Sequence, residues 1–208
     1  EQACAMATEG YARMSDGVGA CIVTTGPGGT NAITGLMGCW TDSIPTVFIS
    51  GQVSTNQTLS ATGLNVRQIG DQEADIISIV KPLTKYAVMV TDPNMIKLHL
   101  DEAFHEATTG RKGPVWLDIP LNVQNAKINP QSLISISKEP HLPKPTNAQI
   151  KKVVDKIKQA SKPLLIVGNG VRLSGCIPEM KKFLELSKMP TVTGINGNDL
   201  LNEDYEHY

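Results

Sequence analysis

The chain has 208 residues, of which 40% are hydrophobic and 19% are charged, and its formal net charge is −1. These values are typical of a globular protein that buries a core. They argue against a nucleic-acid-binding surface, because the chain has no basic excess and only 4% aromatic residues to stack on bases. No apolar run approaches the roughly 20 residues that a membrane-spanning helix needs, so the sequence predicts no membrane partner.

The cysteines and histidines do not form a metal-binding pattern. Cys4, Cys21, Cys39 and Cys176 each lie in an apolar segment, and no two of them have the short spacing of a zinc site. The four histidines are equally scattered. We therefore expect reduced, buried thiols and no metal ligands within this chain, as in a cytoplasmic protein.

The first part of the chain alternates between helical and strand patterns. The strand segments are apolar throughout instead of alternating with polar residues, which is typical of strands buried on both faces. The sequence therefore predicts an α/β fold, with a parallel sheet and helices on both of its faces. The polar residues 53–72 are expected to form a loop. Helices are predicted at residues 2–14, 31–40, 73–80 and 93–108, and strands at residues 19–25, 45–51, 85–90 and 113–120.

Three regions are expected from the change in composition along the chain. Residues 1–123 form the first domain, and residues 124–146, with four prolines and little apolar periodicity, read as a linker. Residues 147–208 begin a second α/β domain, which is too short to complete a sheet. Because a helical pattern starts directly at Glu1, we expect the chain to be a fragment that lacks the start of its first domain.

A glycine-rich turn, "TTGPGGTN" (residues 24–31), connects the first strand to the second helix. Asn31 stands where the dinucleotide-binding fingerprint needs its third glycine, and the next strand does not end in an acid. The Gly-Lys-Ser/Thr of a phosphate-binding loop is also absent. Pro27 removes a backbone donor that a phosphate would use. The turn is better suited to a flat organic ring than to a phosphate.

A second glycine turn, "VGNGVRLSG", contains Gly168 and Gly170. It follows a predicted strand but lacks the third glycine at the required spacing. It is either a tight strand-to-helix turn or a place where the backbone approaches a ligand. The second possibility leaves open a non-catalytic α/β module that binds an adenine nucleotide or has a regulatory role.

Six motifs together resemble the pyrimidine-binding domain of thiamine diphosphate-dependent enzymes. They are "EQACAMATEGYAR", "TTGPGGTN", "GQV", "DQEAD", "KYAVMV" and "GPVWLDIP". Within this superfamily the resemblance is strongest to the large catalytic subunits of acetolactate synthase (acetohydroxyacid synthase). It covers residues 1–123 nearly continuously. It then runs through "SKPLLIVGNGV" and "MPTVTG", which resemble the start of the central domain in that family.

The resemblance assigns roles to individual residues. Glu1 matches the catalytic glutamate that exchanges a proton with the aminopyrimidine ring, and Pro27, Gly28 and Asn31 would contact that ring. Without the other motifs, Glu1 would read as a carboxylate at a helix N-terminus, where the helix dipole favours it. Glu9 is expected to be a structural hydrogen-bonding or capping partner.

The "DQEAD" motif leaves two interpretations open. By resemblance, Gln72 is a catalytic residue that faces the substrate. By its residue types alone, the motif starts a helix, with Asp71 as the N-cap and Glu73 in the first turn. Both interpretations carry similar weight.

The resemblance also implies an activity and its cofactors. The complete protein would decarboxylate a 2-oxo acid such as pyruvate and transfer the two-carbon unit to an acceptor, as in branched-chain amino acid biosynthesis. The diphosphate and Mg²⁺ would be held by a C-terminal domain with a Gly-Asp-Gly motif, which this chain lacks. We therefore expect the fragment alone to be inactive, and the complete protein to be a homodimer or tetramer.

Several residues depart from the family pattern. Asp71 stands where a phenylalanine is usual, and Leu121 stands where a lysine is common. Asn196 lies near a position where the FAD contacts of the family often include a Leu-Met-Gly run. Arg111 does match a frequent FAD-contacting arginine, and Gly168 and Gly170 remain candidates for cofactor contact. FAD is therefore a possible cofactor, and the acceptor substrate stays open.

Overall fold

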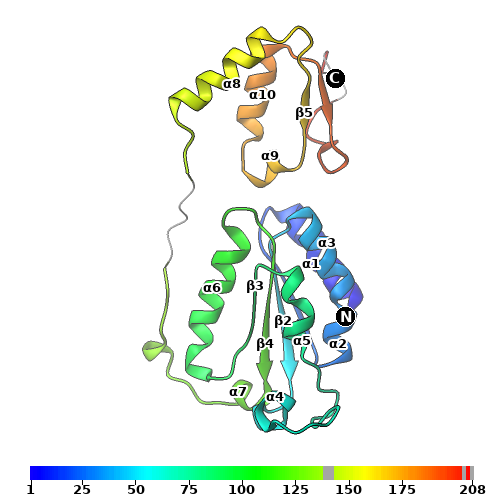
Figure 1. Cartoon of the computed structure of the whole chain (residues 1–208), viewed down its shortest axis with the longest axis vertical. Coiled ribbons are helices and arrows are strands. Elements are labelled where there is room, and N and C mark those ends of the chain that lie inside the picture. The colour runs from blue at the N-terminus through cyan, green and yellow to red at the C-terminus, as the bar shows by residue number, and fades with distance from the viewer. Residues whose placement is uncertain (138–142, 203–204, 207–208) are drawn as a thin grey trace. The chain divides into compact units, whose positions relative to one another are not determined.

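The computed structural model describes residues 1–137, 143–202 and 205–206 (Figure 1). The chain divides into two compact units, Glu1–His141 and Leu142–Tyr208. Each unit has its own hydrophobic core and its own parallel sheet.

The first unit is built on a four-stranded sheet with the strand order β1-β2-β4-β3, in which every pairing is parallel. In the register of this sheet, Ser50 pairs with Val23 on one side and with Asp118 on the other. The carboxyl ends of the three strands therefore meet at one edge. The strands are β1 (Gly19–Val23), β2 (Thr46–Gln52), β3 (Tyr86–Met89) and β4 (Pro114–Pro120).

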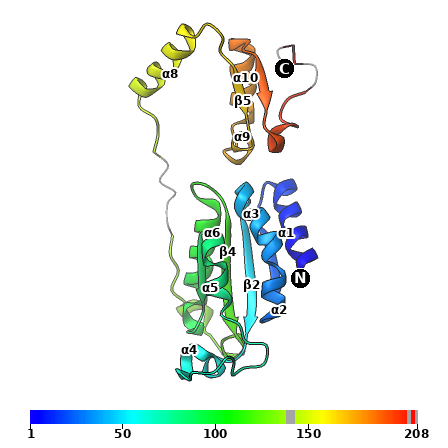
Figure 2. The same cartoon turned by 45° about the vertical axis from the view of Figure 1, so that its right-hand side comes forward.

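Helices cover both faces of this sheet, as the apolar strands predict (Figure 2). One face packs against α1, α3 and α5 through a core that includes Phe48 stacked on Trp116, with ring centroids 5.1 Å apart. The other face packs against α6 through Val47, Val115 and Leu117. The helices of this unit are α1 (Gln2–Ser15), α2 (Pro27–Asn31), α3 (Ile33–Asp42), α4 (Leu59–Thr62), α5 (Ile76–Val80), α6 (Ile96–Thr108) and α7 (Leu121–Gln124).

The second unit is a smaller α/β element with its own core. Val167, Met180 and Leu184 are buried together in it. Its first helix begins with a capping box, in which Thr146 and Gln149 exchange hydrogen bonds between side chain and backbone. The elements are α8 (Asn147–Gln159), β5 (Leu165–Val167), α9 (Gly170–Leu173), α10 (Ile177–Ser187) and β6 (Thr191–Thr193), with β5 parallel to β6.

Some local predictions were wrong. Cys21 and Cys39 are buried as expected, but Cys4 and Cys176 are exposed, because apolar neighbours in sequence do not guarantee an inward-facing side chain. The helix predicted at residues 31–40 is α3, Ile33–Asp42, and a short helix that was not predicted, α2, precedes it within the glycine turn. Within the part of the chain that the structure describes, no helix combines the length and the apolar character needed to cross a membrane.

Candidate functional site

Glu1 and Asn31 meet at the start of the first helix. Glu1 is the N-cap residue of α1, and its backbone carbonyl accepts a 2.9 Å hydrogen bond from the amide of Ala5. Asn31 is the last residue of α2. Its Nδ2 donates a hydrogen bond of 3.0 Å to Oε2 of Glu1, and both side chains are exposed. The structure therefore brings together two of the predicted site residues and leaves them accessible to a ligand.

The glycine turn packs closely against its surroundings. A Cβ atom added to Gly28 would lie 2.7 Å from Cγ2 of Thr24 and 3.6 Å from Cγ of Glu1, so a side chain at this position would have to displace the Thr24 methyl group. The amide of Gly28 donates to the carbonyl of Thr25, and Pro27, the first residue of α2, has no amide hydrogen to offer. The turn is therefore not arranged as a phosphate cradle, in agreement with the sequence-based interpretation.

An open depression of about 770 Å³ lies at the carboxyl ends of β1, β2 and β4, with Glu1 on its wall. The lining combines one carboxylate with apolar and neutral polar groups, and within the described residues it holds no lysine or arginine. Such a surface suits a neutral heteroaromatic ring that can share a proton with Glu1, and it offers nothing to balance a diphosphate. Its lining is Glu1, Ile22, Val23, Thr24, Thr25, Ile49, Ser50, Gly51, Gln52, Val53, Ile119, Leu121 and Gln124.

Gln72 lies against the same turn through its backbone. It has φ +57°, which is unusual for a residue other than glycine, and its side chain is exposed. A Cβ atom added to Gly26, which has φ +56°, would lie 2.0 Å from the carbonyl oxygen of Gln72. The absence of a side chain at Gly26 therefore lets the segment that carries Gln72 dock on the turn.

The "DQEAD" motif does lead into a helix, but Asp71 is not its N-cap and Glu73 is not in its first turn. The following helix, α5, begins at Ile76, and its N-cap is Asp75, whose side chain accepts from the amide of Ser78. Glu73 has a different task. Its carboxylate accepts from the backbone amides of Leu59 at 2.5 Å and Ile69 at 3.1 Å, so it holds the 53–72 segment to this loop.

Arg111 lies away from the Glu1 site. It precedes β4, at the amino end of the strand, and its Nε donates a 2.8 Å hydrogen bond to Oγ of Ser43. Arg111 lines a separate cavity of about 420 Å³ whose walls are basic and partly aromatic. The other lining residues are Met37, Trp40, Thr41, Lys85 and Lys112.

Gly168 and Gly170 belong to the second unit. A Cβ atom at either position would meet nothing within 4 Å, so no neighbour in the described chain requires glycine there. The close backbone approach in this unit is made instead by Gly197, where a Cβ atom would lie 3.2 Å from Gly168.

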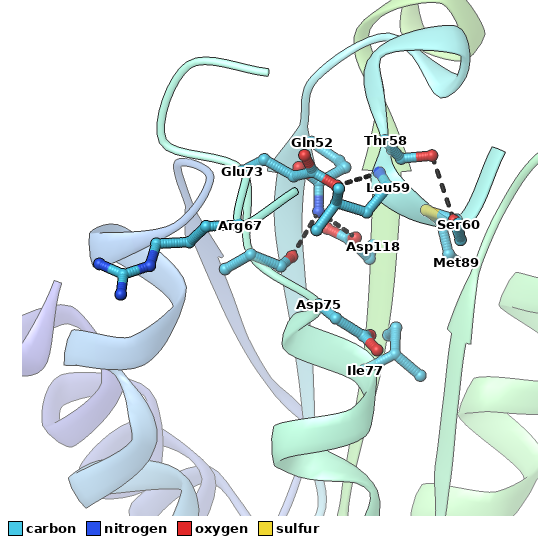
Figure 3. A pocket seen from close by; sticks show the side chains of 11 residues that line it. Gln52, Thr58, Leu59, Ser60, Arg67, Glu73, Asp75, Ile77, Met89 and Asp118 are labelled. Atoms are coloured by element: carbon cyan, nitrogen blue, oxygen red, sulfur yellow. Dashed lines mark hydrogen bonds between the residues drawn. The ribbon is translucent and has the colours of Figure 1, made fainter. Parts of the chain in front are cut away.

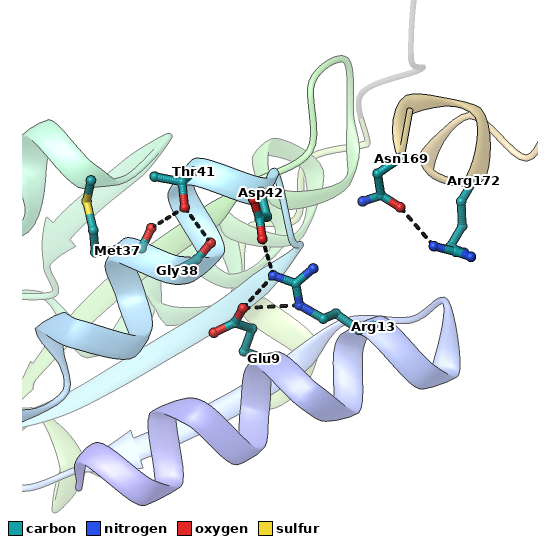
Figure 4. Close-up of polar contacts among 8 residues, drawn as sticks. All are labelled: Glu9, Arg13, Met37, Gly38, Thr41, Asp42, Asn169 and Arg172. Atoms are coloured by element: carbon teal, nitrogen blue, oxygen red, sulfur yellow. Dashed lines mark hydrogen bonds and ion pairs between the residues drawn. The ribbon is translucent and has the colours of Figure 1, made fainter. Parts of the chain in front are cut away.

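Glu9 forms a structural ion pair, as the sequence predicted (Figure 4). Arg13 donates to Oε1 of Glu9 from Nε at 3.1 Å and from Nη2 at 2.6 Å, and also to Asp42 of α3. The guanidinium therefore clamps α1 to α3 and takes no part in the depression.

A buried polar network near the carboxyl ends of β2 and β4 was not predicted from the sequence, and Figure 3 shows two of its members, Gln52 and Asp118. Asp118, only 1% exposed, accepts hydrogen bonds from Ser50 and Gln52. The pKa of Asp118 is raised to about 6, chiefly by burial and to a smaller extent by the nearby Asp75, while the hydrogen bonds from Ser50 and Gln52 oppose this shift. The available signal was the presence of three polar residues near the ends of otherwise apolar strands.

The described residues contain no group of three or more histidine, cysteine, aspartate or glutamate side chains arranged to hold a metal ion. That this chain supplies no metal ligands remains a prediction.

Comparison with known proteins places this geometry in a family. Residues 1–79 match the N-terminal TPP binding domain of thiamine pyrophosphate enzymes, and residues 150–208 match their central domain. The acetolactate synthase large subunit of Corynebacterium glutamicum is 40% identical over 99% of this chain and 32% of its own length. Acetolactate synthase of Arthrospira platensis is 36% identical over 99% of this chain and 35% of its own length.

The acetolactate synthase isozyme 2 large subunit of Escherichia coli K12 is 35% identical over 100% of this chain and 36% of its own length. The chain thus spans about a third of the length of the curated relatives it matches. The matches begin at Glu1 and include the glycine turn, so they cover the Glu1–Asn31 contact. The chain belongs to the thiamine pyrophosphate enzyme family, and it is similar over its whole length to large subunits of acetolactate synthase.

Proposed function

We propose that the complete protein is a thiamine pyrophosphate-dependent enzyme that decarboxylates a 2-oxo acid such as pyruvate and transfers the two-carbon unit to an acceptor. The observation that carries this proposal is the Glu1–Asn31 hydrogen bond beside a neutral depression, in a chain of this family. The family membership favours an enzyme over the non-catalytic nucleotide-binding module that the glycine turns left open.

The lining of the depression fits the cofactor's aminopyrimidine ring. Bound thiamine pyrophosphate supplies the stabilisation of negative charge that decarboxylation of a 2-oxo acid requires. On this proposal, the Glu1 carboxylate holds and returns a proton at a ring nitrogen, which is a general acid–base role. Asn31 fixes the orientation of Glu1 through its 3.0 Å hydrogen bond. Pro27 and Gly28 are not among the residues that line the depression, but they follow Thr24 and Thr25 in the same turn, and we propose that the ring also contacts them.

Gln72 is proposed to face the 2-oxo acid, because its segment docks on the glycine turn. Asp71, next to it, is exposed and would repel a second anionic oxo acid. Leu121 lines the depression where related enzymes often carry a lysine. Asp71 and Leu121 thus support an alternative in which the acceptor is not a second pyruvate and the product is not acetolactate.

Two further ligands are proposed. Mg²⁺ and the diphosphate would be held outside this chain, consistent with the absence of cations from the depression lining in the described residues. The cavity of Arg111, Lys85 and Lys112 combines positive charge with the exposed face of Trp40, which suits an anionic, flat ligand such as FAD. The depression is open, so we also propose a homodimer or tetramer in which another domain completes it. A cytoplasmic location is proposed for this biosynthetic role.

The experiment compares the complete protein with its Glu1→Gln variant, with Mg²⁺ present and thiamine pyrophosphate present or absent, and follows the loss of pyruvate. We expect cofactor-dependent loss in the wild type and a decrease of at least roughly a hundredfold in Glu1→Gln, because removal of an acid–base group costs about that factor. Glu179→Gln is the matched control, since Glu179 is an exposed carboxylate in the first turn of α10.

Acetolactate among the products would name the reaction, and another carboligation product would identify a different acceptor. Pyruvate loss that does not depend on the cofactor, or that survives Glu1→Gln at the wild-type rate, would contradict the proposal.

A further inference from the structure

The side chain of Gln52, at the end of β2, uses all of its hydrogen-bonding capacity. Its Oε1 accepts from Oγ1 of Thr25 at 3.0 Å and from the amide of Val53 at 3.0 Å. Its Nε2 donates to the carbonyl of Ala74 at 2.8 Å and to Oδ2 of Asp118 at 3.0 Å. An amide group has two donors and two acceptor lone pairs, so this side chain is fixed in one orientation.

Asp118 accepts from Gln52 and supports the orientation that the backbone amide of Val53 and the carbonyl of Ala74 impose on the Gln52 amide. Its other oxygen, Oδ1, accepts from Oγ of Ser50 at 2.6 Å, and that hydroxyl accepts from Nε1 of Trp116 at 2.8 Å. Trp116 can only donate, so the Ser50 hydroxyl accepts from it and has its own hydrogen left to donate to Asp118. A buried carboxylate left without donors would be costly, which makes the arrangement of Ser50, Gln52 and Asp118 mutually dependent.

The two remaining partners of Gln52 belong to two different segments of the proposed site. Thr25 lies in the glycine turn, two residues before Pro27, and Ala74 lies in the loop that carries Gln72. The same two segments touch again where the Gln72 carbonyl lies over Gly26. Gln52 also lines both the Glu1 depression and a second cavity of about 600 Å³ that lies beside Glu73 and Asp118 (Figure 3).

We infer that Gln52, hydrogen-bonded to the buried Asp118, is a positioning residue that holds the glycine turn and the loop that carries Gln72 in one fixed relationship. This inference rests on the proposed function. Gln52 does not react. It sets the distance between the surface on which the cofactor ring packs and the loop that presents Gln72 to the 2-oxo acid. Without it, the two segments would keep the contact between Gly26 and Gln72 but would lose the hydrogen bonds that join them through Gln52.

The variants are chosen to separate positioning from folding. Gln52→Ala removes all four hydrogen bonds. Thr25→Val keeps the shape of its side chain and removes only the hydroxyl that reaches Gln52, so it remains informative if Gln52→Ala does not fold. Asp118→Asn retains the shape of the buried group but alters its donors and acceptors. Tyr86→Phe is the matched control, since it removes a side-chain hydrogen bond of 2.7 Å to His99 at the other end of the same sheet.

The experiment uses the complete protein and two measurements. The first is hydrogen–deuterium exchange without cofactor. In Gln52→Ala, residues 24–31 and 70–75 should exchange at least about tenfold faster than in the wild type. In Thr25→Val, only residues 24–31 should exchange faster. The second is the dissociation constant for thiamine pyrophosphate with Mg²⁺, which should rise roughly tenfold or more in each variant, as expected for the loss of a hydrogen bond near 1.4 kcal/mol. Tyr86→Phe should match the wild type in both measurements.

Asp118→Asn combined with Gln52→Ala should cost little more than Gln52→Ala alone, because the two residues act through one network. The inference is overturned if folded Gln52→Ala or Thr25→Val exchanges and binds the cofactor as the wild type does. It is also overturned if the double variant raises the dissociation constant by the full product of the factors measured for Gln52→Ala and Asp118→Asn. Failure of the wild type to bind thiamine pyrophosphate would instead overturn the proposed function, and the wild-type arm reports this separately.

Discussion

Asn31 donates a 3.0 Å hydrogen bond to the carboxylate of Glu1 across thirty residues of sequence. The contact forms because α1 begins and α2 ends near the carboxyl edge of the sheet. One carboxylate oxygen is thereby held in place, while the side chain stays exposed toward the depression. The pair is the part of the structure on which the proposed chemistry depends most.

Replacing Asn31 with aspartate tests this contact. Asn31→Asp keeps the size of the side chain but puts a second carboxylate where a donor now faces Glu1, so the two charges repel. We expect kcat/KM for the 2-oxo acid to fall roughly 10- to 100-fold, corresponding to about 1.4 to 2.7 kcal/mol. Because Asn31 is exposed, the free energy of unfolding should change by less than about 0.5 kcal/mol. Unchanged kcat/KM would show that Asn31 does not orient Glu1.

The contact between Gly26 and Gln72 gives a prediction about stability. Gly26→Ala introduces a Cβ that would lie 2.0 Å from the carbonyl oxygen of Gln72, at a residue with φ +56°. The variant should lose about 2 kcal/mol or more in the free energy of unfolding, from both backbone strain and displacement of the loop.

Gly63→Ala is the matched control for Gly26→Ala. Gly63 has φ +63° but nothing within 4 Å of a Cβ position, so only the backbone strain of about 1 kcal/mol is expected. Urea unfolding followed by tryptophan fluorescence measures the first unit alone, because both tryptophans, Trp40 and Trp116, lie in it. Equal losses in the two variants would show that the loop does not depend on Gly26.

Asp118 makes stability depend on pH in a defined direction. Its pKa rises from 3.8 to about 6 on folding, so the native state holds a proton more tightly than the unfolded state. The resulting stabilisation is fully present below pH 3.8 and is lost as the pH rises through about 6. Asp75, Glu73 and Arg67 line the same cavity and are the charged groups that face this region.

The test compares the wild type with Asp118→Asn by urea unfolding at several pH values. Between about pH 4.5 and pH 8, the wild type should lose about 2 kcal/mol more in the free energy of unfolding than Asp118→Asn loses. The other titrating groups are common to both proteins and cancel in this difference. A difference that does not vary with pH would contradict the assignment.

Arg13 should matter for stability but not for catalysis. Arg13→Met removes the ion pairs with Glu9 on its own helix and with Asp42 on α3, while it keeps an unbranched apolar side chain. We expect a loss of about 1 kcal/mol in the free energy of unfolding, since the pairs are partly exposed. The dissociation constant for thiamine pyrophosphate should stay at the wild-type value. A large rise in that constant at unchanged stability would show that the clamp reaches the site.

The sheet could be predicted because its strands carry an unambiguous signal. The strands around Phe48 and Trp116 are apolar throughout and alternate with helical patterns, and this combination indicates a parallel sheet. The Glu1 and Asn31 positions could be assigned through resemblance of the surrounding motifs. The hydrogen bond between the two side chains was not part of that assignment.

The loop that carries Gln72 could not be predicted in the same way. Its path depends on a positive φ at Gln72 and on close contact with Gly26. Neither feature produces a periodic pattern or a residue preference that could be recognised in the sequence. The N-cap was placed at Asp71 instead of Asp75, because both residues are aspartates before an apolar run. The Gln52 network was missed because long-range side-chain hydrogen bonds are fixed by the fold.

A crystal structure of the complete protein with thiamine pyrophosphate and Mg²⁺ tests the central claim most directly. The account predicts the aminopyrimidine ring in the depression, packed on Pro27 and within hydrogen-bonding distance of the Glu1 carboxylate, while Asn31 keeps its contact with Glu1. A ring bound elsewhere, with Glu1 not in contact with it, would contradict the account.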